Sequence, residues 1–120
     1  MPKILLVEDN ELNRDSLSRL LKRQGMDVIF AEDGEAGVRV ALSDQPDLVL
    51  MDIGLPLMDG FDATRTLRAQ GGKMPIIALT AHALQSDQDK AIASGCNDFE
   101  TKPVEFPRLL GKIKKLIGMD

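Results

Sequence analysis

The chain has 120 residues and a mass of 13.1 kDa, with 43% hydrophobic and 28% charged residues, which is typical of one globular domain. Its formal net charge of -4 argues against general nucleic-acid binding, which needs a basic surface. One cysteine excludes an internal disulfide, and no hydrophobic run could span a bilayer. With no signal-peptide pattern at its start, we expect a cytoplasmic protein that is one domain over residues 1–120, without an effector domain.

Short hydrophobic runs mark the predicted strands. The first four are almost continuously apolar, as is typical of strands buried on both faces of a parallel sheet, and the fifth is weaker. They cover residues 4–7, 28–30, 48–51, 76–79 and 98–100.

Helical patterns separate these runs. In the first helix Leu17 and Leu21 repeat at helical spacing, and Gly25 ends it. Asp33 is the expected N-cap of the second. The remaining helices are expected over about residues 61–70, 87–94 and 106–117, and the last carries one continuous apolar stripe.

This strand–helix alternation predicts a doubly wound α/β fold, with two helices on one face of a parallel sheet and three on the other. Ligands bind such folds beyond the carboxyl ends of the strands. The polar residues that follow the predicted strands are Glu8, Asp9, Asp52, Thr80 and Lys102.

Three clustered carboxylates repel one another, by about 1 kcal/mol per pair ~4 Å apart in water and about 4 kcal/mol at an effective dielectric of 20. A hard divalent cation such as Mg²⁺ relieves this repulsion and also binds phosphate oxygens. Lys102 and the Thr80 hydroxyl would suit a phosphoryl group beside it. Because an aspartate can attack phosphorus itself, Asp52 is the predicted nucleophile. Taken singly, each polar residue could merely begin a turn.

With these residues the chain resembles, over essentially its whole length, the bacterial response-regulator receiver domain. The resemblance lies in four segments, which are specific together although weak singly. They are ILLVEDN at 4–10, MDIGLPLMDG at 51–60, IIALTA at 76–81 and TKP at 101–103. The family implies a flavodoxin-like (βα)5 three-layer sandwich with five parallel strands in the order 2-1-3-4-5.

The resemblance also implies a phosphoacceptor switch of a two-component or phosphorelay system. Asp52 would accept a phosphoryl group from a phosphohistidine on a sensor histidine kinase or a histidine phosphotransfer protein. Asp9, Asp52 and the Gly54 carbonyl would bind Mg²⁺ or Mn²⁺, with Glu8 acting through water. Such a domain phosphorylates and dephosphorylates itself, and is not a turnover enzyme on an external substrate.

In the same family Lys102 would contact the phosphoryl group, Thr80 would move towards it, and Phe99 would turn inward behind Thr80. A local charge change would thereby alter a distant surface. The Lys102–Pro103 peptide would be cis. Gly54 and His82 would flank the attacking water and are candidates for tuning the phosphoryl lifetime, although His82 could simply be solvated.

The family implies two partner surfaces. From the charge and the lack of a long apolar run, we expect no direct contact with nucleic acid or membrane. The candidate contacts for the phosphodonor are Leu12, Asn13, Pro103, Val104 and Phe106. A downstream protein target would bind the fourth helix, fifth strand and fifth helix, including Leu84 and Phe99. We expect a monomer, and dimerisation on phosphorylation stays open.

Besides Phe99, which lacks a tyrosine hydroxyl at the switch position, two residues depart from the family pattern. Glu100 is charged where an apolar strand residue is usual, and we expect it to face solvent or a partner. Glu105 stands at a helix start, where it is a poor cap.

Three other functions fit the sequence less well. A pseudo-receiver that binds partners without phosphorylation is disfavoured by the complete set of acids, threonine and lysine. An aspartyl-phosphate phosphohydrolase would need a general acid where Gly54 stands. A flavin carrier would place its phosphate against Glu8 and Asp9, in a chain without Trp or Tyr.

Overall fold

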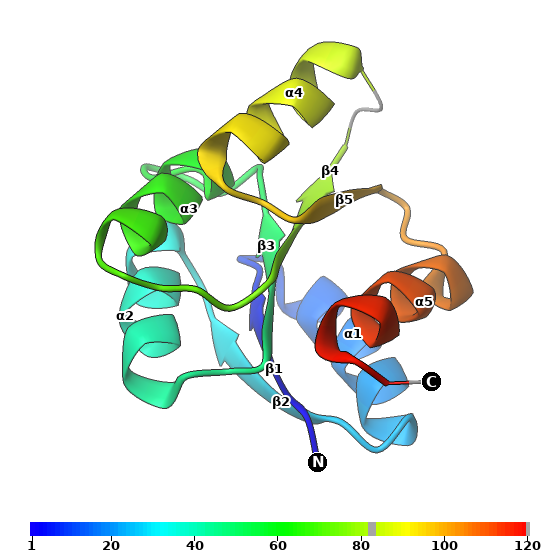
Figure 1. Ribbon diagram of the computed structural model, residues 1–120. Helices are drawn as coiled ribbons and strands as arrows, with labels where there is room; N and C mark the ends of the chain where they lie inside the picture. The colour runs from blue at the N-terminus through cyan, green and yellow to red at the C-terminus, as the bar shows by residue number, and fades with distance from the viewer. Residues whose placement is uncertain (82–83, 120) are drawn as a thin grey trace.

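The structure is a computed structural model that describes residues 1–81 and 84–119. Strands and helices alternate along this part of the chain (Figure 1). The strands are β1 (Lys3–Val7), β2 (Asp27–Ala31), β3 (Leu48–Asp52), β4 (Ile76–Thr80) and β5 (Asp98–Thr101). The helices are α1 (Glu11–Arg23), α2 (Gly34–Asp44), α3 (Gly60–Ala69), α4 (Gln85–Ser94) and α5 (Phe106–Ile117). The predicted elements are confirmed, with ends that differ by one or two residues.

The strands form one parallel sheet in the order β2-β1-β3-β4-β5, which confirms the expected doubly wound topology. β1 lies beside β3, with Val7 opposite Met51. β3 in turn lies beside β4, with Asp52 opposite Leu79. From β1 the chain first moves outward to β2 and then crosses back past β1 to β3. This reversal of direction opens a crevice at the carboxyl ends of β1 and β3.

Helices cover both faces of the sheet, with α2, α3 and α4 on one side and α1 and α5 on the other (Figure 1). This is the predicted three-and-two division. Val38, Ala63 and Ala91 pack on the first side, and Leu21 and Ile113 on the second. These buried contacts fix where each strand ends and therefore where the residues after it lie.

β2 departs from the prediction that the first four strands are buried on both faces. Phe30, the fourth of its five residues, is 41% exposed, whereas β1, β3 and β4 are almost completely buried. The reason is the place of β2 at the edge of the sheet, where helices cover it less fully.

Three helices begin with a side-chain cap directly after a strand or its loop. Asn10, Asp33 and Asp59 each accept a hydrogen bond from the backbone N–H three residues later, which satisfies a group that the helix leaves unpaired. The cap predicted at Asp33 is thus confirmed. Glu105 makes no side-chain cap, as expected, and its carboxylate instead lies 3.5 Å from Arg108.

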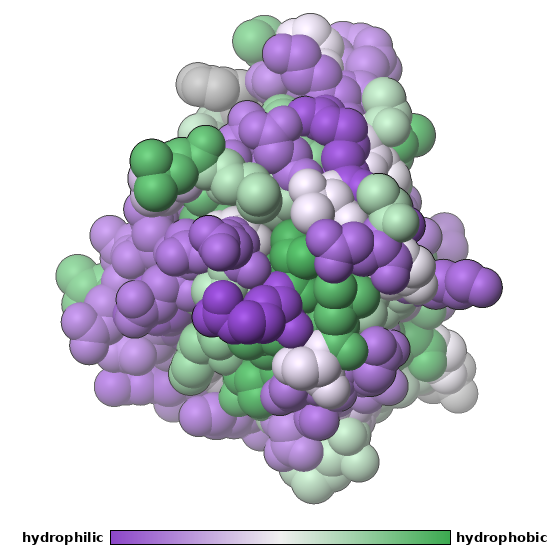
Figure 2. Space-filling view, turned by 90° about the vertical axis from the view of Figure 1, so that its left-hand side faces the viewer, coloured by the Kyte–Doolittle hydropathy of each residue, from purple (hydrophilic) through white to green (hydrophobic). Residues whose placement is uncertain are grey.

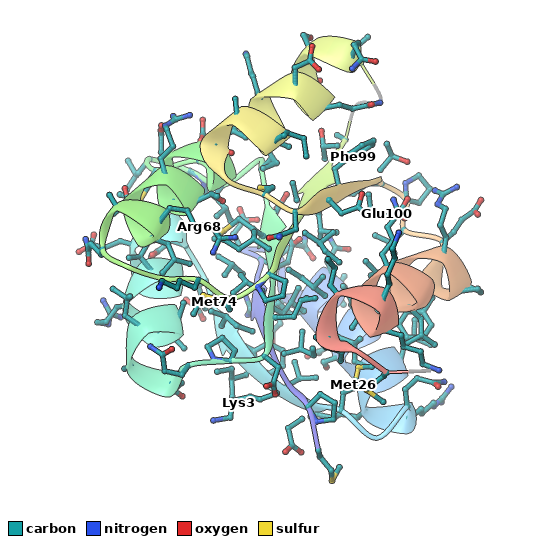
Figure 3. The ribbon with its side chains drawn as sticks, viewed as in Figure 1. Lys3, Met26, Arg68, Met74, Phe99 and Glu100 are labelled. Carbon is teal, nitrogen blue, oxygen red and sulfur yellow. The ribbon has the colours of Figure 1, made fainter. Side chains whose placement is uncertain are left out.

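Arg68 of α3 joins three segments at the edge of the sheet opposite the carboxyl ends (Figure 3). Its guanidinium donates to the backbone carbonyls of Gly72, Met74 and Gly95 and to the side-chain oxygen of Asn97. It therefore ties the loop before β4 to the loop before β5.

The outer face around α2 and α3 is mostly hydrophilic, with a hydrophobic band between the hydrophilic residues (Figure 2). Val38, Leu42 and Met58 line a shallow hollow between these two helices. Among the described residues, no helix is both long enough and apolar enough to cross a membrane.

Candidate functional site

The five polar residues predicted to meet at the carboxyl edge of the sheet do meet there. Asp52 ends β3 and Thr80 ends β4, while Glu8 and Asp9 follow β1 and Lys102 follows β5. All five line one cavity of about 400 Å³. The parallel sheet brings them together because each strand delivers its next residues to the same edge.

Asp52 is buried, with 4% of its surface exposed, and two donors hold one of its oxygens. Lys102 Nζ donates to Asp52 Oδ1 over 2.9 Å. The Gly54 N–H donates to the same oxygen over 3.1 Å. The carboxylate is therefore fixed in orientation while its other oxygen can face a reactant.

Glu8 is equally buried and lies on the other side of the same ammonium. Its Oε2 is 3.3 Å from Lys102 Nζ, and its Oε1 accepts a hydrogen bond from the Asn10 N–H. One lysine therefore bridges two buried carboxylates, one directly after β1 and one at the end of β3, and it fixes the end of β5 relative to both strands.

Burial and neighbouring charge shift two pKa values in this cluster. Burial raises the pKa of the Glu8 carboxyl, and the Asp52 carboxylate raises it further. Burial alone would lower the pKa of the Lys102 ammonium, but Asp52 and Glu8 outweigh it and the net shift is upward. Lys102 therefore stays positively charged beside Asp52 near neutral pH.

The acidic side chains suit a hard divalent cation. Glu8, Asp9 and Asp52 can each offer a carboxylate oxygen, and these three oxygens lie within 4.8 Å of one another. Asp9 is exposed, so water can complete the shell of an ion held there. An all-oxygen set with room for water matches the coordination that Mg²⁺ prefers, and the residues present therefore fit this metal.

The predicted switch residues, Thr80 and Phe99, lie on the neighbouring strands β4 and β5. Thr80 is 6% exposed at the end of β4 and lines the cavity with Asp52. Phe99 pairs with Ala78 across β4 and β5, and its side chain is partly buried on the side of the sheet that α4 covers. The Lys102–Pro103 peptide bond is cis, as the family resemblance implied.

The expectation that Glu100 faces solvent or a partner is wrong. It is 2% exposed and points into the space between β5 and α5 (Figure 3). Arg108 Nε donates to its Oε1 over 2.8 Å, and Lys112 Nζ lies 3.3 Å from its Oε2. Strand pleating places Glu100 on the face opposite Phe99, towards α5, whose two basic residues offset the charge.

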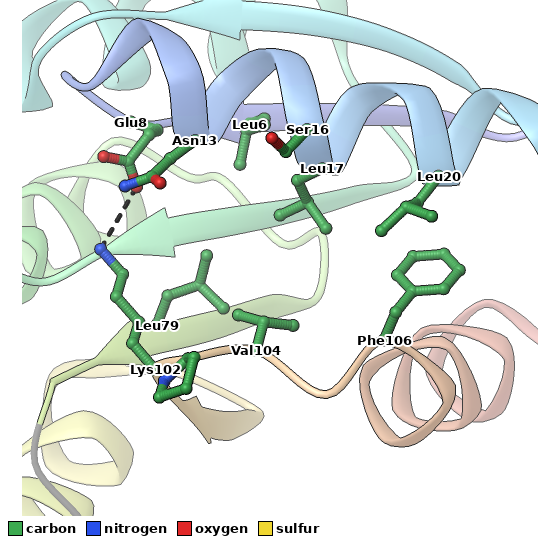
Figure 4. Close-up of a pocket in the computed structure, with 11 residues that line it drawn as sticks. Leu6, Glu8, Asn13, Ser16, Leu17, Leu20, Leu79, Lys102, Val104 and Phe106 are labelled. Atoms are coloured by element: carbon green, nitrogen blue, oxygen red, sulfur yellow. Dashed lines mark hydrogen bonds and ion pairs between the residues drawn. The ribbon is translucent and has the colours of Figure 1, made fainter.

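A second cavity of about 500 Å³ runs from Glu8 and Lys102 along α1, and we name it the α1 groove (Figure 4). In Figure 4 two leucines of α1 face Val104 and Phe106 across it. Its lining includes four predicted donor contacts and two leucines that were not predicted as donor contacts: Asn13, Pro103, Val104, Phe106, Leu17 and Leu20. Leu12 does not line the groove and is 77% exposed on α1.

The loop after β4 holds the remaining predicted residues. His82 lies outside the described residues. Leu84, proposed for the output surface, is 62% exposed at the start of α4. Sequence reasoning missed Asp87, whose side chain adds a carboxylate to the lining of the Asp52 cavity. Its position in the first turn of the weakly patterned α4 gave no signal, because that turn does not directly follow a strand.

The geometry agrees with a comparison to known families. The family model of the response regulator receiver domain matches residues 4–114. The chain belongs to this family. As a receiver domain, it is 36% identical to the polar-differentiation response regulator DivK of Brucella anthropi, over 98% of both chains. It is 37% identical to hybrid signal transduction histidine kinase I of Dictyostelium discoideum, over 92% of this chain but only 7% of that protein.

Solved receiver structures share the fold closely. The receiver domain of sensor histidine kinase PA1611 from Pseudomonas aeruginosa is 41% identical, with a TM-score of 0.90 and 98% of both chains covered, and it holds magnesium in its active-site cleft. The Saccharomyces cerevisiae receiver domain of Ssk1, crystallised with the histidine phosphotransfer protein Ypd1, is also similar. It is 31% identical, with a TM-score of 0.90 over 96% of this chain and 88% of that one.

Proposed function

We propose that this receiver domain is a phosphoacceptor switch in which Asp52 carries the phosphoryl group. The observation that supports this most directly is the set of hydrogen bonds to the Asp52 carboxylate. One of its oxygens is held by Lys102 and by the Gly54 N–H, inside a cavity that Asp9 and Thr80 also line. A carboxylate held in this orientation is positioned for attack on phosphorus.

The proposed reaction transfers one phosphoryl group between two nucleophiles. A carboxylate oxygen of Asp52 forms a bond to phosphorus as the bond from phosphorus to the donor's imidazole nitrogen breaks. The electron pair of that bond stays on the imidazole. Lys102 pairs with an oxygen of the bound phosphoryl group, and the Thr80 hydroxyl donates to another. Attack by water on phosphorus later releases phosphate and restores the carboxylate.

Magnesium is the proposed cofactor, with Mn²⁺ as an alternative ion. Asp9 and Asp52 would hold it directly with the Gly54 carbonyl, and Glu8 would act through water. When bound, the ion neutralises negative charge on the phosphoryl oxygens. The fit of Glu8, Asp9 and Asp52 to an oxygen-binding cation supports this assignment, as does the magnesium in the similar PA1611 receiver.

The proposed donor is a phosphohistidine protein that docks on the α1 groove. The groove is largely apolar and opens directly beside the reactive cluster, since Glu8 and Lys102 line both cavities. A helix seated there would bring its phosphohistidine to Asp52, and an apolar centre with a polar rim is typical of such interfaces. The similarity to Ssk1, crystallised with the histidine phosphotransfer protein Ypd1, supports this class of donor.

The proposed output is a change of the surface around α4, β5 and α5. Phosphorylation would draw Thr80 towards the phosphoryl group, and Phe99 would occupy the space behind it. A downstream protein would read the altered face, of which Leu84 is an exposed part. In this scheme the domain is a switch and does not turn over an external substrate.

Intact-mass spectrometry after incubation with acetyl phosphate tests the chemistry. We expect one phosphoryl adduct that forms with Mg²⁺ and is lost when Mg²⁺ is chelated. Asp52→Asn should abolish the adduct because an amide is a poor nucleophile towards phosphorus. Asp87→Asn is the matched control, since it removes a carboxylate from the same cavity and should leave labelling intact.

Two outcomes would contradict the proposal. Equal labelling of wild type and Asp52→Asn would place the phosphoryl group elsewhere. No adduct on a folded wild-type protein under any metal condition would favour a pseudo-receiver that binds its partners without phosphorylation.

A further inference from the structure

One ammonium group contacts three consecutive residues of β5. Lys112 Nζ of α5 donates to the Phe99 backbone carbonyl over 2.5 Å and lies 5.1 Å from the centroid of the Phe99 ring. It is also 3.7 Å from Asp98 Oδ1 and 3.3 Å from Glu100 Oε2. A lysine therefore ties α5 to the backbone and ring of the residue proposed to switch.

Glu100 holds this ammonium in place. Its Oε1 accepts from Arg108 and from the Thr101 N–H. Its Oε2 is buried and makes no hydrogen bond in the described part of the chain, so that Lys112, at 3.3 Å, supplies its countercharge. A buried carboxylate is costly without a cation beside it. Lys112 is therefore bound more tightly than a lysine on an exposed helix face.

We propose that Lys112 is a positioning residue for the switch, and that it holds Phe99 in its unphosphorylated position through the ring contact and the carbonyl hydrogen bond. The inference rests on the proposed function, because it assumes that Phe99 moves when Asp52 is phosphorylated. Turning the ring inward separates it from the ammonium, so that the contact must be lost before the switch can complete.

The expected effect follows from the size of the ring contact. A cation over an aromatic ring at a partly exposed site shifts an equilibrium by about two- to fivefold. Lys112 lies on such a site, with a quarter of its side chain exposed. Without the ammonium, the unphosphorylated protein should populate the inward ring about two- to fivefold more, and Asp52 should be phosphorylated faster by a similar factor.

The test follows the Phe99 ring by NMR in protein labelled with ¹³C-phenylalanine. The chain has four phenylalanines, and a Phe99→Leu variant assigns the signal. Wild type with and without acetyl phosphate and Mg²⁺ defines the two ends of the switch. Lys112→Met removes the charge but keeps the stem, and Lys115→Met is the matched control on an exposed position of the same helix.

We expect the Phe99 signals of Lys112→Met, before phosphorylation, to move part of the way towards the wild-type phosphorylated position. Lys115→Met should stay at the wild-type position, and Lys112→Arg should restore it by returning a cation. Signals of Lys112→Met that coincide with unphosphorylated wild type, with an unchanged labelling rate, would overturn the proposal. A wild type that takes no phosphoryl group would instead overturn the proposed function.

Because the single substitution leaves the buried Glu100 carboxylate with less countercharge, Lys112→Met could unfold the protein. A second variant controls for this effect. In Lys112→Met/Glu100→Gln the buried carboxylate is removed together with its cation, and the neutral pair should fold. The same partial shift of the Phe99 signals is expected. A folded double variant with wild-type Phe99 signals would equally refute the role of Lys112.

Discussion

Gly60 begins α3 against the strand that carries Asp52, and Gly60→Ala tests whether this contact positions the site. A Cβ at residue 60 would lie 2.4 Å from the Asp52 carbonyl oxygen and 2.9 Å from Ile53 Cα. Both are backbone atoms, which cannot rotate away. The helix and the end of β3 would therefore have to separate.

The magnitude follows from two opposing effects. Overpacking a buried contact costs about 1–3 kcal/mol, while alanine favours a helix over glycine by about 1 kcal/mol. We expect Gly60→Ala to be less stable than wild type by at most about 2 kcal/mol. Gly111→Ala in α5 is the matched control, because a Cβ there meets nothing within 4 Å. It should gain about 0.5–1 kcal/mol.

Urea unfolding followed by circular dichroism measures both variants, since the chain has no Trp or Tyr for fluorescence. The initial rate of labelling by acetyl phosphate with Mg²⁺ reports the site. A displacement of about 1 Å can cost 10²-fold in rate, so Gly60→Ala should be slower than Gly111→Ala by at least about tenfold. If the two variants were equally stable and equally fast, the packing of α3 on β3 would not position Asp52.

Three further results are expected. Arg68→Met should lower the free energy of unfolding by about 1.5–3 kcal/mol, whereas Arg39→Met, on an exposed position of α2, should not; equal values would refute the role of Arg68. Burial would raise the pKa of Glu100, but Arg108 and Lys112 hold it below its ordinary 4.5. The stability advantage of wild type over Glu100→Gln should therefore be full near neutral pH and shrink as pH falls below 4.5, and a difference independent of pH would contradict this. Gly54→Leu should slow the loss of phosphate, because a Cβ there lies 3.8 Å from Asp52 Oδ1; an unchanged decay rate would exclude shielding from water.

The sequence predicted the fold because each strand and helix carried its own signal. Continuous apolar runs marked β1, β3 and β4, and their polar successors had to meet once the strands were parallel. The proximity of Glu8, Asp52 and Lys102 could therefore be predicted without any knowledge of side-chain conformations. The edge position of β2 also follows from the strand order, but the exposure of Phe30 does not follow from hydrophobicity alone.

The local polar contacts could not be predicted in the same way. Glu100 looked like an exposed charge, because sequence shows neither the direction of a side chain on a four-residue strand nor the basic residues of α5 that meet it. Asp87 lines the cavity from the first turn of α4, which does not directly follow a strand. Such contacts depend on the packing of helices against strands, which periodicity does not specify.

The most direct test of the account is to map the phosphoryl group itself. Borohydride reduces an acyl phosphate to an alcohol, which converts a phosphorylated aspartate to homoserine and leaves a free carboxylate unchanged. After treatment with acetyl phosphate and Mg²⁺, tandem mass spectrometry of the reduced peptides should find homoserine at residue 52, and only in the sample that contained Mg²⁺. Homoserine at Asp9 or Asp87, or at no aspartate of a labelled protein, would contradict the assignment of Asp52 as the phosphoacceptor.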